Sequence, residues 1–279
     1  MIRILIPTDF SDQAKYAFIM AKKFADKIGA EVQFLNVISW SEPEVGSDGK
    51  KHASEAEDEK VLAANLIASE QKMKEWKKST DDNIPHQIIF GPVTKSIIDY
   101  AEKNLFDLIV MGTKGASGLK AWLSGSDTQH VVRNSKVPVL SLMCDRSDLD
   151  VKNLLLVHDF TEGNEKNNPS CIKLIKAINF NFGSTINLLH VADNKKENKE
   201  QLLTRMDEFA MRNDFCRHKS HVHYDSNVEA GVTHFNQMND MDIIFIGTKE
   251  KTGWAGFLKS DVAEKLVQHT YKPIITFKS

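Results

Sequence analysis

Cysteine is scarce in this chain: three cysteines occur among 279 residues. They stand far apart, at Cys144, Cys171 and Cys216, and none belongs to a CxxC pair. This spacing indicates neither a disulfide framework nor a zinc finger, and it is typical of a reducing compartment. We therefore expect a cytoplasmic protein.

An excess of basic charge and a long apolar segment are also absent. The 36 Lys and Arg residues are balanced by 38 Asp and Glu residues, for a formal net charge of -2. A nucleic-acid backbone usually requires a concentrated basic face, so we expect no nucleic-acid partner. Met1 leads directly into the apolar run Ile2–Ile6, and no later apolar run approaches about 18 residues. We expect neither an export signal nor a membrane partner.

Several enzyme signatures are missing as well. No G-x-G-x-x-G motif follows the first apolar run, and the chain has no G-x4-G-K-[ST] loop, no G-x-S-x-G elbow and no helix motif with paired metal-binding histidines. The sequence therefore assigns no catalytic residue and no metal ligand.

What the chain does have is an internal repeat. The segments Asp107–Pro138 and Asp242–Pro273 align without a gap at an offset of 135 residues. A repeat of this length predicts two domains, at residues 1–146 and 147–279, joined by the charged stretch Asp145–Lys152. Shorter matches extend the repeat: Asp9-Phe10-Ser11 with Asp159-Phe160-Thr161, Leu35-Asn36-Val37 with Leu189-His190-Val191, and Gly91 with Ser226.

Short aliphatic runs alternate with longer amphipathic segments, which is typical of β-α units on a buried parallel sheet. The predicted fold class is α/β: two tandem open-sheet domains, each of about five parallel strands with flanking helices, in a Rossmann-like arrangement. In the first half we expect strands at Ile2–Pro7, Val32–Val37, Gln87–Phe90, Leu108–Gly112 and Val139–Leu142, and helices at Gln13–Ile28, Ala53–Lys78, Thr94–Lys103 and Ser126–Asn134. In the second half we expect strands at Asn153–Val157, Thr185–Val191, Ser220–His223, Asp242–Ile246 and Ile274–Phe277.

Glycines distinguish the two copies of the repeat. The first copy reads Gly112-Thr-Lys-Gly115, nine residues, then Gly125-Ser126, whereas the second reads Gly247-Thr-Lys-Glu250, nine residues, then Ser260-Asp261. Ordinary turn chemistry is one interpretation of these glycines, but it does not explain why they diverge while the rest of the repeat survives. A lost glycine indicates that something approaches the backbone closely in the first copy only.

The first glycine motif has the properties of a phosphate-binding segment. Bare backbone at Gly112 and Gly115 would let N–H groups approach anionic oxygens, and Gly125 precedes a predicted helix whose first N–H groups are unpaired. Lys114 adds a cation, and the hydroxyls of Ser126 and Thr128 can cap the helix or donate to phosphate.

The candidate binding residues stand at predicted strand ends. Asp9, Val37, Gly91 and Gly112 all fall at or just beyond the carboxyl ends of strands. In an open parallel sheet, ligands bind outside these ends, so segments distant in sequence are expected to converge there.

These motifs resemble the universal stress protein family in its tandem two-domain form. The resemblance covers essentially the whole chain, and it implies an adenine-nucleotide alpha-hydrolase-like fold. It also implies a stress-response protein that binds ATP, with or without Mg²⁺, as a nucleotide-dependent binding or regulatory module. The residues that carry it are Pro7-Thr8-Asp9, Leu35-Asn36-Val37, the glycine motif of the first copy and Val137-Pro138-Val139.

By this resemblance, the adenine nucleotide lies in the first domain. The residues implied around the nucleoside are Pro7, Thr8, Asp9 and Val37, and those around the ribose-phosphate end are Met111, Gly112, Lys114, Gly115, Gly125, Ser126 and Thr128. For Asp9, capping of the following helix together with Ser11 is an equally good interpretation. Asp127 departs from the family pattern: its carboxylate either weakens triphosphate binding unless magnesium intervenes, or points away and favours the helix N-terminus.

The second domain is not expected to bind ATP in the same manner, because Glu250 stands where phosphate oxygens would approach. Packing, a partner surface or another ligand, such as a small apolar molecule, are the open alternatives for it. Cys216, His218, His221 and His223 stand close together, and their thiolate and imidazole groups suit zinc, so a metal site is one open interpretation. Their spacing matches no zinc signature, and exposed or edge-strand histidines are the preferred interpretation.

Two alternatives to an ATP-dependent module apply to the whole chain. One is a nucleotide-independent scaffold for unknown protein partners. The other is a slow ATPase, for which no residue stands out as a water-activating base. The resemblance also implies that Val137–Leu142 and Pro273–Phe277 pair within this chain as an internal pseudo-dimer, with a further homodimer left open.

Overall fold

The computed structural model describes residues 1–40, 55–80, 84–113, 127–160, 168–192, 197–248, 266 and 271–278. The first half of the chain contains β1 (Arg3–Pro7), α1 (Asp12–Ile28), β2 (Glu31–Ser39), α2 (Glu55–Thr80), β3 (His86–Gly91), α3 (Val93–Lys103), β4 (Leu108–Gly112), α4 (Asp127–Asn134) and β5 (Val139–Leu142). The second half contains β6 (Asn153–Val157), α5 (Pro169–Phe182), β7 (Thr185–Ala192), α6 (Lys199–Arg212), β8 (His218–Tyr224), α7 (Val228–Asn239), β9 (Ile243–Thr248) and β10 (Ile274–Lys278). Every strand and every first-half helix predicted from the sequence is present, with ends that differ by three residues at most.

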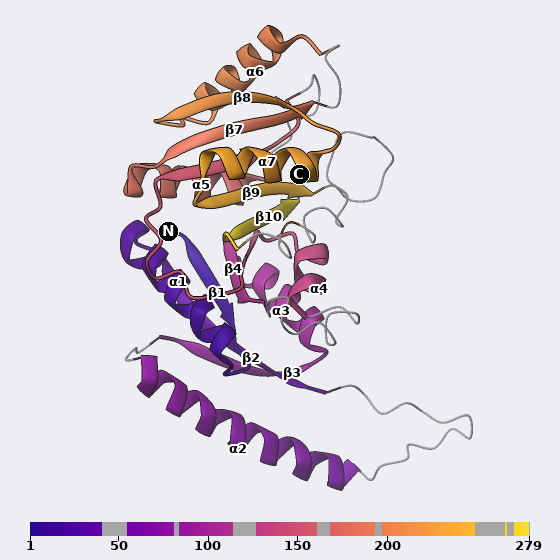
Figure 1. Cartoon of the computed structure of the whole chain (residues 1–279). Coiled ribbons are helices and arrows are strands. Elements are labelled where there is room, and N and C mark those ends of the chain that lie inside the picture. The colour runs from indigo at the N-terminus through magenta and orange to yellow at the C-terminus, as the bar shows by residue number, and fades with distance from the viewer. Residues whose placement is uncertain are drawn as a thin grey trace, which may run out of the picture.

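The strands form one 10-stranded sheet in the order β3-β2-β1-β4-β5-β10-β9-β6-β7-β8 (Figure 1). Neighbouring strands within each half are parallel. The two halves meet where β5 and β10 pair antiparallel, with Leu140 beside Ile275. The α/β fold class with two tandem sheet units is therefore confirmed, and so is the predicted pairing of the two last strands.

The junction between β5 and β10 carries one side-chain bond from each half. Ser141 Oγ donates to the carbonyl of Ile274 at 3.4 Å, and Thr276 Oγ1 donates to the carbonyl of Val139 at 3.3 Å. All four residues of β5 are buried. Because buried hydroxyls need partners, these reciprocal bonds favour this strand register over a shifted one.

Helix α1 begins and ends at residues suited to those positions. Ser11 caps its N-terminus and accepts a hydrogen bond from the amide of Ala14 at 3.3 Å, and Gly29 ends it with φ 66. Helix α5 uses the same devices, with Asn168 as its N-cap and Gly183 at φ 67. Glycine is favoured at the C-terminal ends of both helices, because this left-handed conformation crowds a Cβ atom.

Equivalent aspartates explain part of the repeat. In the first half, Asp107 Oδ2 accepts a hydrogen bond from the amide of Arg3 at 2.9 Å. In the second half, Asp242 Oδ2 accepts from the amide of Asn153 at 2.7 Å. Each carboxylate thus precedes one central strand and holds the first residue of the neighbouring strand.

One hydrophobic core runs through both halves on one face of the sheet. Helices α1 and α5 pack against each other there, and the rings of Phe24 and Phe182 meet edge to face with centroids 6.0 Å apart. The opposite face carries a separate core in each half. Leu149 and Val151, within the expected linker, are buried in the shared core. The linker is therefore part of the packed structure.

Among the described residues, no helix combines the length and the apolar character that crossing a membrane requires.

We predict that Phe24→Ala destabilises the protein by about 3–5 kcal/mol, because it leaves a cavity in the shared core. The side chain of Phe24 is fully buried. The matched control is Phe180→Ala, which removes a ring that is 75% exposed and should change the free energy of unfolding by less than about 0.5 kcal/mol. Urea unfolding followed by circular dichroism measures both. Equal losses in the two variants would contradict the shared core.

Candidate functional site

The central strands of the first half bring the predicted nucleoside residues to one edge of the sheet. β1 lies between β2 and β4, with Pro7 beside Leu35 on one side and Leu5 beside Ile109 on the other. The core of α1 covers one face of these strands, whereas α3 and α4 pack on the other. We call the predicted nucleotide-binding residues near this edge the carboxyl-edge site; its described members are Pro7, Thr8, Asp9, Val37, Met111, Gly112 and Thr128.

A tight turn after β1 presents the carboxylate of Asp9. The amide of Thr8 donates to the carbonyl of Leu35 at 2.8 Å, and the hydroxyl of Thr8 accepts from the amide of Phe10 at 3.0 Å. Asp9 Oδ1 accepts from the amide of Ser11 at 3.0 Å, and the side chain of Asp9 is exposed. Oδ1 of Asp9 thus holds the amide of Ser11, the N-cap residue of α1, which favours a local supporting role for Asp9; its Oδ2 has no hydrogen-bond partner among the described residues.

Backbone strain accompanies this turn. Phe10 has φ 66, in the left-handed region that a bulky residue rarely adopts. Its ring packs edge to face against Trp76, with centroids 6.1 Å apart, which helps to hold the conformation. The conformation costs about 1–3 kcal/mol, and strain of this kind clusters at binding sites. The equivalent Phe160 has no such conformation.

Asn36 is a site residue that sequence reasoning missed. Its side chain is buried, and Nδ2 donates to the carbonyl of Thr8 at 2.8 Å, which ties the end of β2 to the end of β1. Its Oδ1 is also buried and has no hydrogen-bond partner among the described residues. The signal in the sequence was the exchange of Asn36 for His190 between otherwise matching triplets.

Gly112 has a structural reason to be glycine. A Cβ atom there would lie 2.2 Å from the backbone oxygen of Gln13, so the end of β4 approaches the first turn of α1 too closely for any side chain. The hydroxyl of Thr128 donates to the carbonyl of Gly112 at 3.1 Å. The absence of a side chain at Gly112 thus allows β4 to pack closely against α1, and the hydrogen bond from Thr128 links α4 to β4.

Asp127 is held by a neighbouring helix. Its Oδ1 accepts a hydrogen bond from Thr94 Oγ1 at 3.1 Å, and it occupies the first turn of α4. This arrangement favours the interpretation that Asp127 supports the helix N-terminus.

Part of the predicted phosphate end lies outside the described residues. This applies to Lys114, Gly115, Gly125 and Ser126, and to their counterparts Glu250, Ser260 and Asp261. Their predicted roles stay predictions. Among the described residues, Pro7 and Met111 are buried, and Val37 is half-buried against the core that contains Ile109.

The second half has a different polar arrangement at the equivalent edge. Asp159, the counterpart of Asp9, is buried, and its Oδ1 lies 3.9 Å from His190 Nδ1. His190 Nε2 in turn lies 2.9 Å from Glu197 Oε2. The carboxylate that is exposed in the first half therefore faces an imidazole within the protein in the second.

The cysteine and histidines noted in the sequence do not form one cluster. His218 lies 3.4 Å from Asp207 of α6, whereas His221 packs its ring against Phe235 of α7 on the other face of β8. Cys216 is exposed and precedes the strand. Because β8 is the outermost strand on one side of the sheet, the prediction of edge-strand histidines is confirmed. Burial, together with the nearby Lys219, lowers the pKa of His221 below its ordinary value.

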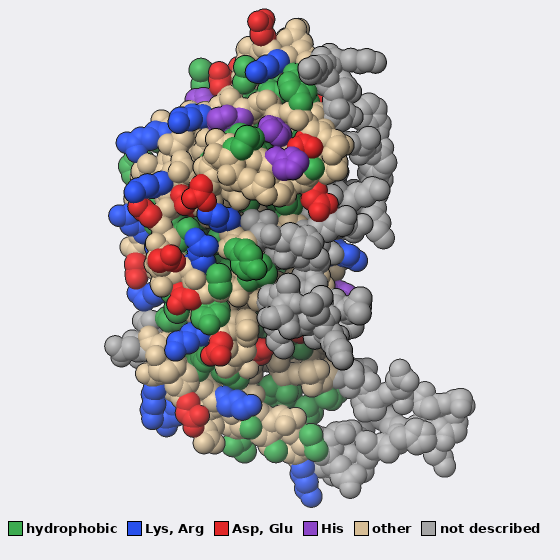
Figure 2. All heavy atoms as spheres, in the orientation of Figure 1, with side chains coloured by type: hydrophobic (Ala, Val, Ile, Leu, Met, Phe, Trp, Pro, Cys, Tyr) green, Lys and Arg blue, Asp and Glu red, His purple; other side chains and the backbone are tan. Residues whose placement is uncertain are grey.

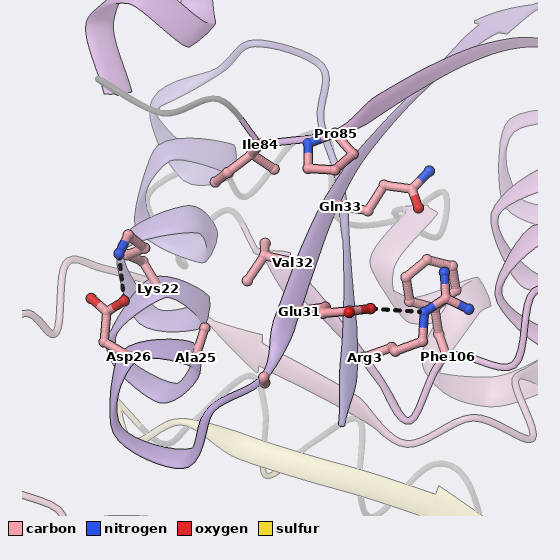
Figure 3. A pocket seen from close by; sticks show the side chains of 11 residues that line it. Arg3, Lys22, Ala25, Asp26, Glu31, Val32, Gln33, Ile84, Pro85 and Phe106 are labelled. Atoms are coloured by element: carbon pink, nitrogen blue, oxygen red, sulfur yellow. Dashed lines mark hydrogen bonds and ion pairs between the residues drawn. The ribbon is translucent and has the colours of Figure 1, made fainter. Parts of the chain in front are cut away.

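A cavity of about 600 Å³ lies at the opposite edge of the sheet, near the amino ends of β1 and β2 (Figure 3). Its charged side chains face one another in two pairs, Arg3 with Glu31 and Lys22 with Asp26 (Figure 3). Since these charges already have partners, and ligands of such sheets bind at the carboxyl ends, we do not assign the nucleotide to this cavity.

The fold and the carboxyl-edge site define a Rossmann-like α/β protein built from two tandem units. The family model described as the universal stress protein family matches residues 1–142, and the chain belongs to that family.

Individual relatives agree with this assignment. The universal stress protein MJ0531 of Methanocaldococcus jannaschii is 36% identical over 147 residues, which cover 50% of this chain and 79% of that protein. The universal stress protein MJ0577 of the same organism is 31% identical over 149 residues, covering 50% of this chain and 92% of that protein. A solved universal stress protein from Archaeoglobus fulgidus shares the fold over 99% of this chain and 98% of that chain, with a TM-score of 0.67 and 21% identity.

We predict that Gly112→Ala destabilises the protein by about 2–3 kcal/mol, because the new Cβ atom would press on the backbone of Gln13. The matched control is Gly29→Ala, where no atom lies within 4 Å of the new Cβ and only the left-handed φ of 66 is strained. That control should lose about 1 kcal/mol. Urea unfolding compares the two, and a Gly112→Ala loss no greater than that of the control would show that α1 yields easily.

Proposed function

We propose that the first half of this universal stress protein binds ATP at the carboxyl-edge site, and that the protein acts as a nucleotide-dependent binding or regulatory module. The observation that carries the proposal is the exposed Asp9 carboxylate, at the carboxyl end of a strand that lies between β2 and β4. We propose a role in the stress response because the chain belongs to the universal stress protein family.

Sheet topology supports this position for a nucleotide. The chain leaves β1 toward β2 on one side and returns from β3 to β4 on the other, so β1 and β4 flank the point where the strand order reverses. Ligands of open α/β sheets bind outside the carboxyl ends at such a point. The half-buried Val37 offers apolar contact area to a base there, and Asp9 can accept hydrogen bonds from ribose hydroxyls through Oδ2.

The contrast between the halves supports a single nucleotide site. Asp9 is exposed, whereas its counterpart Asp159 is buried beside His190. A ribose hydroxyl at the second position would have to reach a carboxylate that is only 8% exposed. We therefore propose that residues 1–146 form the nucleotide-binding domain and that residues 147–279 form a domain that does not bind ATP in this manner.

The phosphate end of the proposal rests on the glycine motif. Gly112 ends β4, and Gly125 and Ser126 immediately precede α4, whose N-terminus carries the positive end of the helix dipole. We propose that Lys114 and the backbone at Gly115 contact the phosphates, with Mg²⁺ bound to the phosphate oxygens rather than to a dedicated protein site.

We predict that Asp9→Asn weakens ATP binding by about tenfold or more, because hydrogen bonds to a charged acceptor contribute about 1.5–3 kcal/mol. The matched control is Asp26→Asn, which removes an exposed carboxylate at the opposite edge of the same half and should leave affinity unchanged. Isothermal titration with ATP, in the presence and absence of Mg²⁺, measures both variants. Wild-type protein that binds no ATP would favour a nucleotide-independent scaffold.

We predict that Gly115→Glu, which copies Glu250 of the second half, abolishes ATP binding. The new side chain adds bulk and a negative charge where phosphate oxygens are expected to approach. The same titration tests it, with the thermal midpoint as the control for folding, and unchanged affinity would refute the phosphate assignment. Phosphate release from the same samples measures whether the bound ATP is hydrolysed.

A further inference from the structure

Three potential metal ligands converge in the second half of the protein. They are His223 near the end of β8, Asp225 just after it and His234 in α7. One ligand atom from each lies within 4.8 Å of the other two. Figure 2 shows histidine side chains side by side over the region where Figure 1 draws β8 and α7, with acidic side chains close by.

We propose that His223, Asp225 and His234 bind a single divalent transition-metal ion, for which Zn²⁺ is the probe. We call these three residues the His-Asp-His site. Two imidazoles and one carboxylate suit zinc and similar ions, whereas Mg²⁺ and Ca²⁺ prefer an all-oxygen set.

An ion would lengthen the contact between Asp225 and His234 and would hold closer together the two imidazole nitrogens, which lie within 4.8 Å of each other. Asp225 Oδ2 lies 2.6 Å from His234 Nδ1 and 3.6 Å from His223 Nε2. Ligand atoms about 2.0–2.1 Å from a tetrahedral ion lie about 3.3 Å from one another. His234 has a side chain that is 57% exposed, so its ring has room for the small rotation that opens the contact with Asp225.

The carboxylate of Asp225 is already oriented for a metal ion. Its Oδ1 accepts a hydrogen bond from the amide of Ser226 at 2.7 Å, which leaves Oδ2 toward the two imidazoles. A hydrogen bond to the oxygen that faces away from the imidazoles orients the carboxylate, as outer-shell hydrogen bonds do for metal ligands.

Rigid elements position all three ligands. His223 pairs with Val191 in the sheet, and the amide of Asp225 donates to the carbonyl of Ala192 at 3.1 Å. Asn227 caps α7 by accepting from the amide of Ala230 at 2.9 Å, which fixes the helix that carries His234. The ring of Phe235 packs edge to face against His223, with centroids 6.2 Å apart. A binding site on such supports needs little reorganisation.

The first half shows that the fold does not demand these residues. Val37 pairs with Ile89, whereas its counterpart Val191 pairs with His223. His234 stands, at the repeat offset of 135, where α3 has Asp99, which forms an ion pair with Lys95. The first half thus has the apolar Ile89 and the salt-bridged Asp99 where the second half has the imidazoles of His223 and His234.

The number of protein ligands at the His-Asp-His site indicates a position for an exogenous ligand. Three protein ligands leave the fourth position of a tetrahedral ion for water or a substrate atom. Because this position lies next to the exposed His234, we infer that it is accessible to solvent.

The test uses the untagged 279-residue chain, treated with a chelator and titrated with Zn²⁺ in competition with a fluorescent zinc indicator. We expect one Zn²⁺ per chain, and affinity at least tenfold lower in His234→Ala and in Asp225→Asn. The matched control is His218→Ala, which removes a histidine beside a carboxylate on the other face of β8 and should keep affinity within twofold. Mg²⁺ at the same concentration should not displace Zn²⁺.

Because His234 is exposed, His234→Ala is expected to fold normally, and the thermal midpoint of the metal-free variant checks this. Zn²⁺ should raise the midpoint of the wild type and not that of His234→Ala. Absence of stoichiometric binding, or equal affinity in wild type and His234→Ala, would overturn the site and leave the His-Asp contacts as ties between α7 and β8. The titration contains no nucleotide, so its failure is distinct from failure of the ATP proposal.

Discussion

The antiparallel pairing of β5 with β10 is the interaction on which the rest of the structure depends. It turns two open sheets, each with a strand edge that would otherwise be unpaired, into one sheet of 10 strands. It also brings α1 and α5 into contact, so that a single core extends over both halves on one face. The buried Leu149 and Val151 follow from this arrangement, since the connection between the halves crosses that core.

Shared packing lets the polar ends of the strands diverge. The same sheet geometry constrains the core residues of both copies, whereas residues at the carboxyl edge contribute little to the packing of that core. Asp9 is exposed while Asp159 is buried beside His190, and Ile89 has His223 as its counterpart in the sheet register. The two halves can therefore carry different chemistry: a proposed nucleotide site in the first and a proposed metal site in the second.

Hydrophobic periodicity made most of the fold predictable. Runs such as Leu108–Gly112 have the same bounds in the sequence prediction and in the structure, because a continuous aliphatic run bounded by polar residues has few other ways to be buried. Helix α1 could be bounded closely because Ser11 and Gly29 are capping residues. Part of the candidate site could also be predicted, since Asp9, Val37 and Gly112 follow from strand ends alone. Asn36 was missed because a buried amide inside a strand has no local sequence signature.

The sequence by itself determined the α/β units and their duplication, because these follow from local periodicity and from matching segments of the chain. The pairing of the last strands was predicted from the family resemblance alone. Only the tertiary structure decided which side chains meet. It separated His218 from His221 across the two faces of β8, and it joined His223 to His234, which a turn and the first half of α7 separate in sequence. The physical reason is that strand alternation and helix placement set side-chain direction in space, and neither is a function of sequence distance.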